Sequence, residues 1–206
     1  MNSKEWNKRI ARRSDFSSKL VHLTKNHDAT SGFGNLFKIL TEKKILGSTT
    51  ESGFICGNIP AVCFQDMPLH SIAENIYYEQ YLKKNQNSQK HRYTGYGLRF
   101  SKEYIYQKGG RPVIYDRTKD AKSYLNEDNY WRIVNFDLSN KDNYIDWTHE
   151  REWRLPNNLD FELSAVEVLL HDEKGYKNFI RRCREISSPD ILYEIKSIIV
   201  MPSLIF

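Results

Sequence analysis

Two carboxylates, Glu150 and Glu152, stand two residues apart in the segment WTHEREWRLP, close to the tryptophans Trp147 and Trp153. On a β-strand, residues two apart face the same side, so we expect both carboxylates to project into one cleft. Carboxylates that share a cleft either share a raised pKa or divide the roles of acid and base. An edge strand whose alternating charges lie in water is the alternative, so the spacing indicates chemistry only together with other residues.

A second pair of polar side chains, His22 and Thr24, lies in the segment KLVHLT. Its alternation of apolar and polar residues predicts a strand over residues 19–24, with both side chains on one face. Such a pair, facing a glutamate from a later strand, could bind a ribose and a carboxamide. A histidine packed in the core is the alternative.

Composition limits the function classes. The 206 residues are 39% hydrophobic and 13% aromatic, which is typical of a polar, aromatic-rich globular chain. Lys and Arg number 31 against 26 Asp and Glu, and this excess of +5 favours phosphate-bearing partners. The three cysteines, Cys56, Cys63 and Cys183, form no CxxC pair, so we expect neither a disulfide framework nor a zinc site.

Several familiar sequence signals are missing. No GxGxxG opens a helix, and no GxxxxGK[ST], GxSxG or HExxH occurs, which argues against Rossmann and P-loop nucleotide binding. The beginning of the chain lacks the apolar core of a signal peptide, and no apolar run approaches the roughly 20 residues that cross a bilayer. We therefore expect a cytoplasmic protein with no membrane partner and no metal.

The order of elements predicts an α+β fold. Strands are expected over residues 19–24, 61–64, 97–100, 112–115, 152–156, 164–172 and 195–202. Helices are expected over 36–48, from a turn at 66–68 to about 84, shortly after 100 and over 175–186, while 130–138 fits a strand or a short helix. Residues 1–16 form a basic arm or helix, and residues 85–94 a polar loop. This pattern predicts a single domain over 1–206, with a mixed split β-sheet core of about seven short strands and flanking helices.

The motifs in this order resemble the AbiGi-type abortive phage-infection proteins, and more distantly the DarT-like members of the ADP-ribosyltransferase fold. The likeness spans residue 19 to about 170. VCFQDMP resembles the family's Cys-Phe-x-Asp-x-Pro strand end, and HEREWR resembles its glutamate-bearing strand.

This resemblance implies an ADP-ribosyltransferase-like sheet that binds NAD in a cleft. His22 and Thr24 would contact the adenosine ribose or the nicotinamide, Glu152 would be the catalytic glutamate, and Glu150 would position the acceptor. A carboxylate beside the ribose stabilises the oxocarbenium-like cation that forms as the bond to nicotinamide breaks. Aromatic rings would sandwich the nicotinamide, and the candidates are Phe64, Tyr96 and Tyr104.

The resemblance therefore predicts an NAD-dependent ADP-ribosyltransferase, a toxin of phage defence that modifies RNA or DNA, with an antitoxin protein as a further partner. The arginine that DarT-like enzymes carry after the first helix has no match, and neither has their central tyrosine or serine motif, so the acceptor stays open. One alternative is a transferase that modifies a protein side chain. Others are a non-catalytic, antitoxin-like binding member of the fold and a metal-dependent nuclease using His22, His149 and Glu152.

Overall fold

The computed structural model describes residues 1–27, 29–78, 93–186 and 190–201. The chain divides into two compact units, each built from separate segments. Unit 1 comprises Met1–Lys43, Met67–Ser101 and Phe161–Phe206, and unit 2 comprises Lys44–Asp66 and Lys102–Asp160. Because the segments interleave along the chain, no single cut in the sequence separates the units, and the expectation of one domain over 1–206 stays a prediction.

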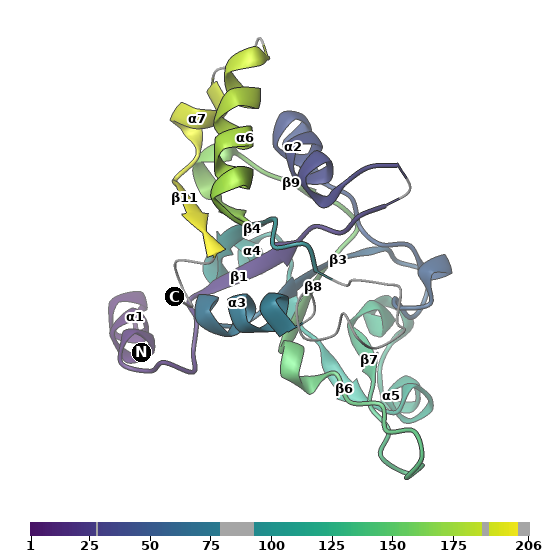
Figure 1. The fold of residues 1–206 in the computed structure, drawn as a ribbon. Helices are drawn as coiled ribbons and strands as arrows, with labels where there is room; N and C mark the ends of the chain where they lie inside the picture. The colour runs from purple at the N-terminus through teal and green to yellow at the C-terminus, as the bar shows by residue number, and fades with distance from the viewer. Residues whose placement is uncertain (28, 79–92, 187–189, 202–206) are drawn as a thin grey trace. The chain divides into compact units, whose positions relative to one another are not determined.

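Unit 1 contains four neighbouring strands (Figure 1). β1 (Lys19–Leu23) and β10 (Glu167–Leu170) both pair antiparallel with β4 (Gly97–Ser101). β11 (Ser197–Val200) pairs parallel with β10. The two central strands, β4 and β10, are mostly buried, which agrees with their apolar sequences.

The helices of unit 1 have recognisable starts and stops. They are α1 (Ser3–Ala11), α2 (Gly32–Glu42), α3 (Leu69–Tyr77), α6 (Glu173–Glu185) and α7 (Asp190–Glu194), with the 3₁₀ turn η6 (Leu163–Ala165). Asn2 begins α1 with a capping box to Glu5, and Ser31 begins α2 by accepting a hydrogen bond from the backbone of Gly34. Asp172 caps α6 in the same way.

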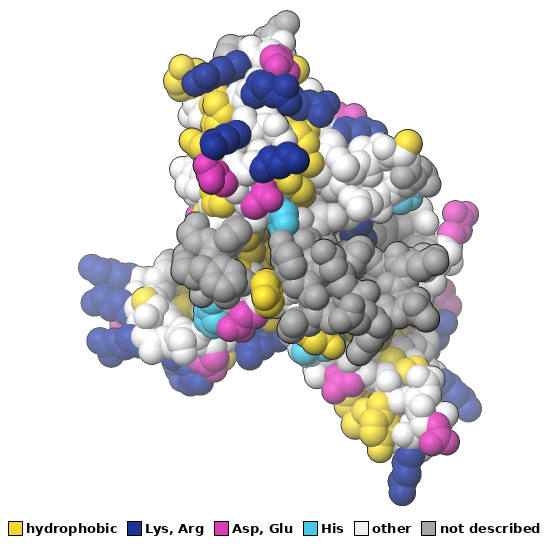
Figure 2. All heavy atoms as spheres, viewed as in Figure 1, with side chains coloured by type: hydrophobic (Ala, Val, Ile, Leu, Met, Phe, Trp, Pro, Cys, Tyr) yellow, Lys and Arg dark blue, Asp and Glu magenta, His cyan; other side chains and the backbone are white. Residues whose placement is uncertain are grey.

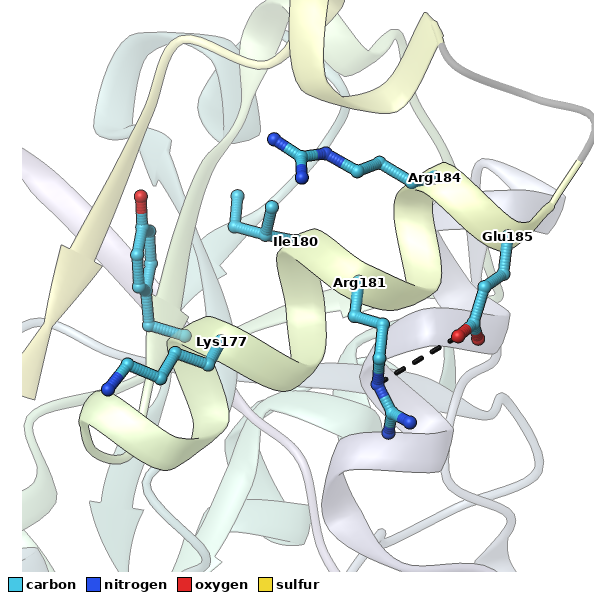
Figure 3. Close-up of a pocket in the computed structure, with 6 residues that line it drawn as sticks. Lys177, Ile180, Arg181, Arg184 and Glu185 are labelled. Atoms are coloured by element: carbon cyan, nitrogen blue, oxygen red, sulfur yellow. Dashed lines mark ion pairs between the residues drawn. The ribbon is translucent and has the colours of Figure 1, made fainter.

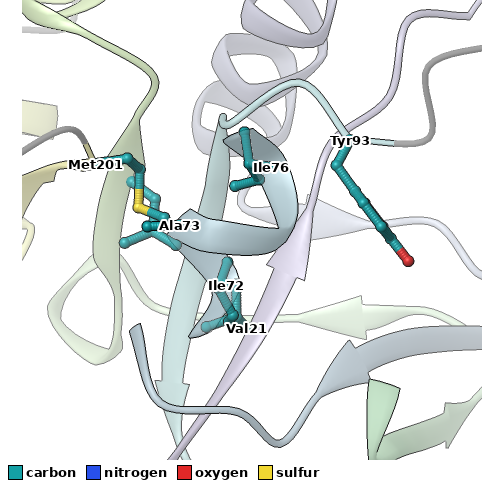
Figure 4. Close-up of a cluster of buried hydrophobic side chains, with 7 residues drawn as sticks. Val21, Ile72, Ala73, Ile76, Tyr93 and Met201 are labelled. Carbon is teal, nitrogen blue, oxygen red and sulfur yellow. The ribbon is translucent and has the colours of Figure 1, made fainter. Parts of the chain in front are cut away.

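One face of α3 packs onto the strands of unit 1 (Figure 4). Ile72, Ala73 and Ile76 follow the spacing of a single helix face and are almost fully buried. They share a cluster with residues of β1, β10 and nearby segments, namely Val21, Leu169, Tyr93 and Met201. This apolar contact holds α3 against the sheet.

Unit 2 contains the strand on which the candidate carboxylate Glu152 lies. β8 (Glu152–Pro156) pairs antiparallel with both β3 (Ala61–Gln65) and β5 (Arg111–Pro112). Two further pairs are β2 (Lys44–Ile45) with β9 (Leu159–Asp160), antiparallel, and β6 (Ile114–Asp116) with β7 (Ile133–Asn135), parallel. The helical segments are α4 (Lys102–Gln107), α5 (Thr118–Tyr124) and the 3₁₀ turns η1 (Thr50–Ser52), η4 (Glu127–Arg132) and η5 (Thr148–Glu150).

The α+β class is confirmed: helices flank a mixed, mostly antiparallel sheet. Every strand predicted with four or more residues has a counterpart, although the one predicted over 112–115 is two short strands, β5 and β6. The helix predicted over 36–48 begins earlier and ends earlier, because Lys43 adopts a left-handed conformation with φ 52° and stops it.

Other boundaries differ as well. The helix α5 lies in the polar stretch after residue 117, where the sequence predicted no helix. The helix predicted to reach residue 84 is observed as α3, and residues 79–84 lie outside the described residues, as does most of the predicted loop 85–94. Within the described ranges, no helix has the length and apolarity needed to cross a membrane.

Candidate functional site

Glu152 is the first residue of β8, and its backbone is held on both sides. Its N–H donates to the hydroxyl of Tyr115 at 2.8 Å, and its carbonyl accepts from the N–H of Val113 at 3.1 Å. The residue is only 9% exposed. A carboxylate with so little access to water needs charged or hydrogen-bonding partners inside the protein.

Arg154 supplies those partners from the same strand. Because the two residues are two apart, they share a face of β8, and the guanidinium Nε and Nη2 donate to the two carboxylate oxygens at 2.8 and 3.3 Å. The remaining guanidinium protons go to backbone carbonyls: Nη1 donates to Trp131 and Ile133 at 2.9 and 3.0 Å, and Nη2 donates to Phe54 at 3.1 Å. All five guanidinium donors therefore have acceptors.

This ion pair is buried. Arg154 is only 3% exposed, and burial, the largest single cause, acts to lower its pKa. Electrostatic interactions with Glu152 and Cys63, together with hydrogen bonds to both side chains, outweigh burial and raise the pKa of Arg154 above its ordinary value. The carboxylate of Glu152 is thus held in a fixed orientation by a buried guanidinium.

Gln65 lies directly opposite Glu152 in the antiparallel pairing of β3 with β8. Directly opposite residues of an antiparallel pair project from the same face, so the amide and the carboxylate are neighbours. Gln65 is 6% exposed, and neither its Oε1 nor its Nε2 has a hydrogen-bond partner. An unsatisfied buried polar group of this kind costs about 1–3 kcal/mol of stability.

Further polar groups surround the end of β3 that carries Gln65. The N–H of Asp66 donates to the carbonyl of Arg151 at 3.1 Å, which extends the pairing by one residue. The ammonium of Lys102 lies 2.8 Å from the Asp66 carboxylate and 5.8 Å from the ring centroid of Trp153. A second ion pair thus stands near Trp153, whose side chain projects from the face of β8 opposite to that of Glu152.

The phenol of Tyr115 is neutral beside the carboxylates. Burial is the largest cause that raises the pKa of Tyr115 to about 12, and the negative charges of Glu152 and Glu150 add to it. At neutral pH this hydroxyl therefore stays protonated while it accepts the hydrogen bond from the Glu152 backbone.

The prediction that Glu150 and Glu152 share one face of a single strand is wrong. Glu150 ends the 3₁₀ turn η5, and Arg151 follows with a left-handed φ of 44°, so the strand begins only at Glu152. The carboxylate of Asp146 stabilises this turn by accepting from the N–H and the hydroxyl of Thr148 at 2.8 and 2.6 Å. Local turn chemistry therefore separates the two carboxylates, although both act on the pKa of Tyr115.

Three of the predicted cofactor-binding residues, His22, Thr24 and Tyr96, lie in unit 1. His22 is half-buried on β1, opposite Leu98, and Thr24 comes just after the strand. The Thr24 hydroxyl donates to the carbonyls of Gly32 at 2.8 Å and Tyr96 at 3.1 Å, and the Thr24 N–H donates to Tyr96 as well. Thr24, which is 3% exposed, thus ties the start of α2 to the residue that precedes β4.

The ring of Tyr96 packs edge-on against Phe33, with 5.4 Å between ring centroids. Burial raises the pKa of Tyr96, and the charge of Asp172 raises it further. The structure brings Thr24 and Tyr96 together through hydrogen bonds to the Tyr96 carbonyl, and the assignment of both residues to cofactor binding stays a prediction.

The other two predicted aromatic residues, Phe64 and Tyr104, lie in unit 2. Phe64 is opposite Trp153 in the β3–β8 pairing, so it faces away from the side that carries Gln65 and Glu152. At 1% exposure it is a core residue, which corrects its assignment as a ring that stacks on a ligand. Tyr104 is half-buried on α4, with the ammonium of Lys108 5.6 Å from its ring centroid.

Sequence reasoning missed three residues of this site: Gln65, Tyr115 and Arg154. Gln65 could have been found as a polar residue that ends the apolar run AVCF, and Arg154 as a cation two residues after Glu152 on a strand. Tyr115 carried no such signal, because only the fold brings β6 next to β8. Among the residues with a described position, no group of three or more His, Cys, Asp or Glu side chains could hold a metal ion.

Comparison with known proteins returned no match: no protein-family model, no curated protein and no solved structure is similar to this chain. The geometry of unit 2 therefore stands on its own as a candidate site.

Proposed function

We propose that the chain is an NAD-dependent ADP-ribosyltransferase in which Glu152 is the catalytic carboxylate. The observation that carries the proposal is the oriented, buried Glu152 at the start of β8, beside an amide with unused hydrogen-bonding capacity. The resemblance of VCFQDMP and HEREWR to ADP-ribosyltransferase motifs supports it, because these two segments supply Gln65 and Glu152. NAD, as the substrate, matches a site that combines a carboxylate, a neutral hydroxyl and a free amide.

Each residue has a role in this proposal. The carboxylate of Glu152 stabilises positive charge that develops on the ribose when the bond to nicotinamide breaks. Arg154 orients the carboxylate, and one guanidinium N–H on each oxygen leaves lone pairs for a ribose hydroxyl. Tyr115 fixes the backbone of Glu152. Glu150, half-buried in the preceding turn, is the residue left to position the acceptor.

We propose a nucleic acid as the acceptor, on the basis of the basic surface of α6. Figure 2 shows Lys and Arg side chains gathered over this helix. A pocket of about 330 Å³ lies along it, lined by Tyr176, Lys177, Ile180, Arg181, Arg184 and Glu185 (Figure 3). Cations interleaved with an exposed tyrosine favour phosphates and stacked bases. The resemblance alone supports a role as a phage-defence toxin controlled by an antitoxin, while the proposal of a cytoplasmic protein rests on the missing export signals in the sequence.

A non-catalytic, partner-binding protein of the same fold is the second candidate. The specific observation in its favour is that both oxygens of Glu152 already accept hydrogen bonds from Arg154, at a residue exposure of 9%. On this reading the glutamate only neutralises a buried arginine. It predicts a folded protein that neither cleaves NAD nor transfers label.

The test is an assay of nicotinamide release and of label transfer from NAD to DNA, RNA and protein, comparing wild type with Glu152→Gln. We expect turnover to fall by at least about a hundredfold, the effect typical of losing one electrostatic stabiliser of a transition state. Glu167→Gln is the matched control, because Glu167 is also an arginine-paired carboxylate at the start of a strand.

Stability needs its own control, because Glu152→Gln also leaves a buried guanidinium without its counter-charge. Leu155→Ala removes a buried side chain, 3% exposed, from the same strand and costs about 2–5 kcal/mol. If Leu155→Ala keeps its turnover while the folded Glu152→Gln protein has none, the carboxylate acts in chemistry. Wild-type protein that releases no nicotinamide and labels no acceptor would move the assignment to the partner-binding protein.

A further inference from the structure

The amide of Gln65 is a polar group that the proposed chemistry does not use. Gln65 is only 6% exposed, and neither the oxygen nor the nitrogen of its amide has a hydrogen-bond partner. Most buried polar side-chain atoms in folded proteins have at least one partner, so an amide with none calls for an explanation.

The neighbours of Gln65 do not provide one. Glu152, directly across the ladder, has its two oxygens bound by Arg154 at 2.8 and 3.3 Å. The next residue, Asp66, directs its carboxylate to Lys102 at 2.8 Å. The charged groups around Gln65 are thus engaged with one another, and the amide remains the group with capacity to donate and to accept.

A side-chain amide has one acceptor oxygen and two N–H donors on the same plane. The ligand group that complements it must accept and donate side by side, as a primary carboxamide does, and two such amides form a pair of antiparallel hydrogen bonds. A carboxylate or phosphate, which only accepts, leaves Oε1 unsatisfied and places negative charge next to Glu152.

We infer that Gln65 binds the carboxamide of the nicotinamide ring and so selects NAD at this site. The inference rests on the proposed function, since it names the group by which that substrate is recognised. Because Gln65 and Glu152 are directly opposite each other on neighbouring strands, a carboxamide bound by Gln65 lies close to the carboxylate of Glu152. Gln65 is a binding residue here, and its side chain takes no part in bond breaking.

The test is the calorimetric affinity of the purified protein for NAD and for its 3-acetylpyridine analogue, in which a methyl group replaces the amide nitrogen. The analogue keeps the carbonyl acceptor and the charge, so it removes only the donors. We expect wild type to bind the analogue at least about tenfold more weakly, the effect of leaving one buried partner unpaired.

The variant Gln65→Met keeps the length of the side chain and removes its polar atoms. It should bind NAD about tenfold more weakly than wild type and should not distinguish NAD from the analogue. Gln107→Met, the same substitution at an exposed position of α4, is the control and should keep both affinities. The free Gln65→Met protein should melt at the same temperature as wild type or about 2–4 °C higher, since an unsatisfied amide is lost.

The outcomes separate the two proposals. Wild type that binds NAD without preferring it over the analogue, or Gln65→Met that keeps the preference, overturns the carboxamide inference and leaves the transferase standing. A lower melting temperature for Gln65→Met also overturns the inference, because the amide would then have a structural role. Wild type that binds neither dinucleotide overturns the transferase and this inference together. A wild type without the preference overturns the inference before any variant is made, and a wild type with it is assigned to Gln65 by the loss of the preference in Gln65→Met.

Discussion

Two carboxylates of this molecule, Glu152 in unit 2 and Glu167 in unit 1, have similar positions and different surroundings. Each begins a strand, and each accepts a hydrogen bond from an arginine. The cation of Glu152 comes from its own strand, whereas Glu167 takes Arg99 from β4 at 2.7 Å and Lys19 from β1 at 3.0 Å.

The difference lies in the residue across the ladder. Opposite Glu167 stands Arg99, which neutralises it, while opposite Glu152 stands Gln65, which has no partner. The Glu167 cluster has two cations for one carboxylate, although the Nε of Arg99 lacks a hydrogen-bond partner. In the Glu152 cluster, every donor of Arg154 has an acceptor, whereas the amide of Gln65 has no partner. Gln65 is therefore the residue whose hydrogen bonds a ligand would supply.

Thr24 resembles Glu167 in that its polar groups are bound by other groups of the protein. Its hydroxyl and its N–H are used by backbone carbonyls of Gly32 and Tyr96, so the group that the sequence nominated for a ligand holds two segments of unit 1 together. Thr24, which the sequence predicts as a binding residue, thus has its hydroxyl and N–H bound within the protein, whereas the amide of Gln65, which the sequence did not single out, has no partner.

The largest effect is expected for Arg154→Met. This change leaves the carboxylate of Glu152 buried without its cation and removes a donor from the carbonyls of Trp131, Ile133 and Phe54. Breaking a buried ion pair by removing one partner costs about 3–5 kcal/mol, and urea unfolding followed by circular dichroism measures the loss.

The matched control is Lys177→Met, which removes the cation of an ion pair whose side chains are 72% and 78% exposed. It should change the free energy of unfolding by less than about 1 kcal/mol. Equal losses in the two variants would show that the Glu152–Arg154 pair is solvated, and the contrast between the two units would disappear.

An intermediate effect is expected for Thr24→Val, which keeps the shape of the side chain and removes the hydroxyl. The carbonyl of Gly32 loses its side-chain donor in a buried place, so we expect a loss of about 1–3 kcal/mol in the free energy of unfolding. Thr30→Val, at an exposed threonine six residues later, should stay within about 0.5 kcal/mol of wild type.

The Thr24 variant also tests the function of this position, through calorimetry with NAD. If Thr24 serves structure alone, the folded Thr24→Val protein binds NAD as wild type does, whereas a weaker affinity at full folding would restore Thr24 as a ligand-binding residue.

The fold was predictable where hydrophobic periodicity is strong. The strands β1, β3, β4, β8, β10 and β11 and the helix α6 were expected from apolar runs and amphipathic spacing, because burial alone decides such segments. The strands β2 and β9 were not expected, and neither was the pairing of β6 with β7, although the strand predicted over 112–115 overlaps β6 and the strand or helix predicted over 130–138 contains β7. Strands of two or three residues carry no period and depend on long-range pairing.

The site was predictable in part. Glu152 stood out because a charged cluster between tryptophans is unusual, but the partner across the ladder depends on register, which a single sequence does not define. The ExE interpretation assumed that the strand included Glu150, and the left-handed Arg151 prevented it. Phe64 was nominated by position along the motif, whereas the alternation of β3 sends Gln65, and not Phe64, to the face of Glu152.

The smallest effect is expected for Glu167→Gln, and it depends on pH. Burial acts to raise the pKa of Glu167, but the hydrogen bond from Lys19 and the charge of Arg99 prevail and lower it below the ordinary value of 4.5. A lowered pKa in the folded state means that the ionised carboxylate stabilises the fold above pH 4.5, and that this stability is lost as the pH falls through the folded-state pKa.

At pH 7, Glu167→Gln should therefore lower the free energy of unfolding by less than about 1 kcal/mol relative to wild type. The effect is small because the carboxylate is partly solvated and its ion pairs are screened. This difference in the free energy of unfolding should shrink as the pH falls below 4.5, because the Glu167 carboxylate of wild type is then protonated and loses the charge that the glutamine already lacks. Urea unfolding at pH 7, 5 and 3.5 measures it. A difference that is the same at all three values would mean that Glu167 acts through packing and not through its charge, and Glu167 would then be no electrostatic counterpart of Glu152.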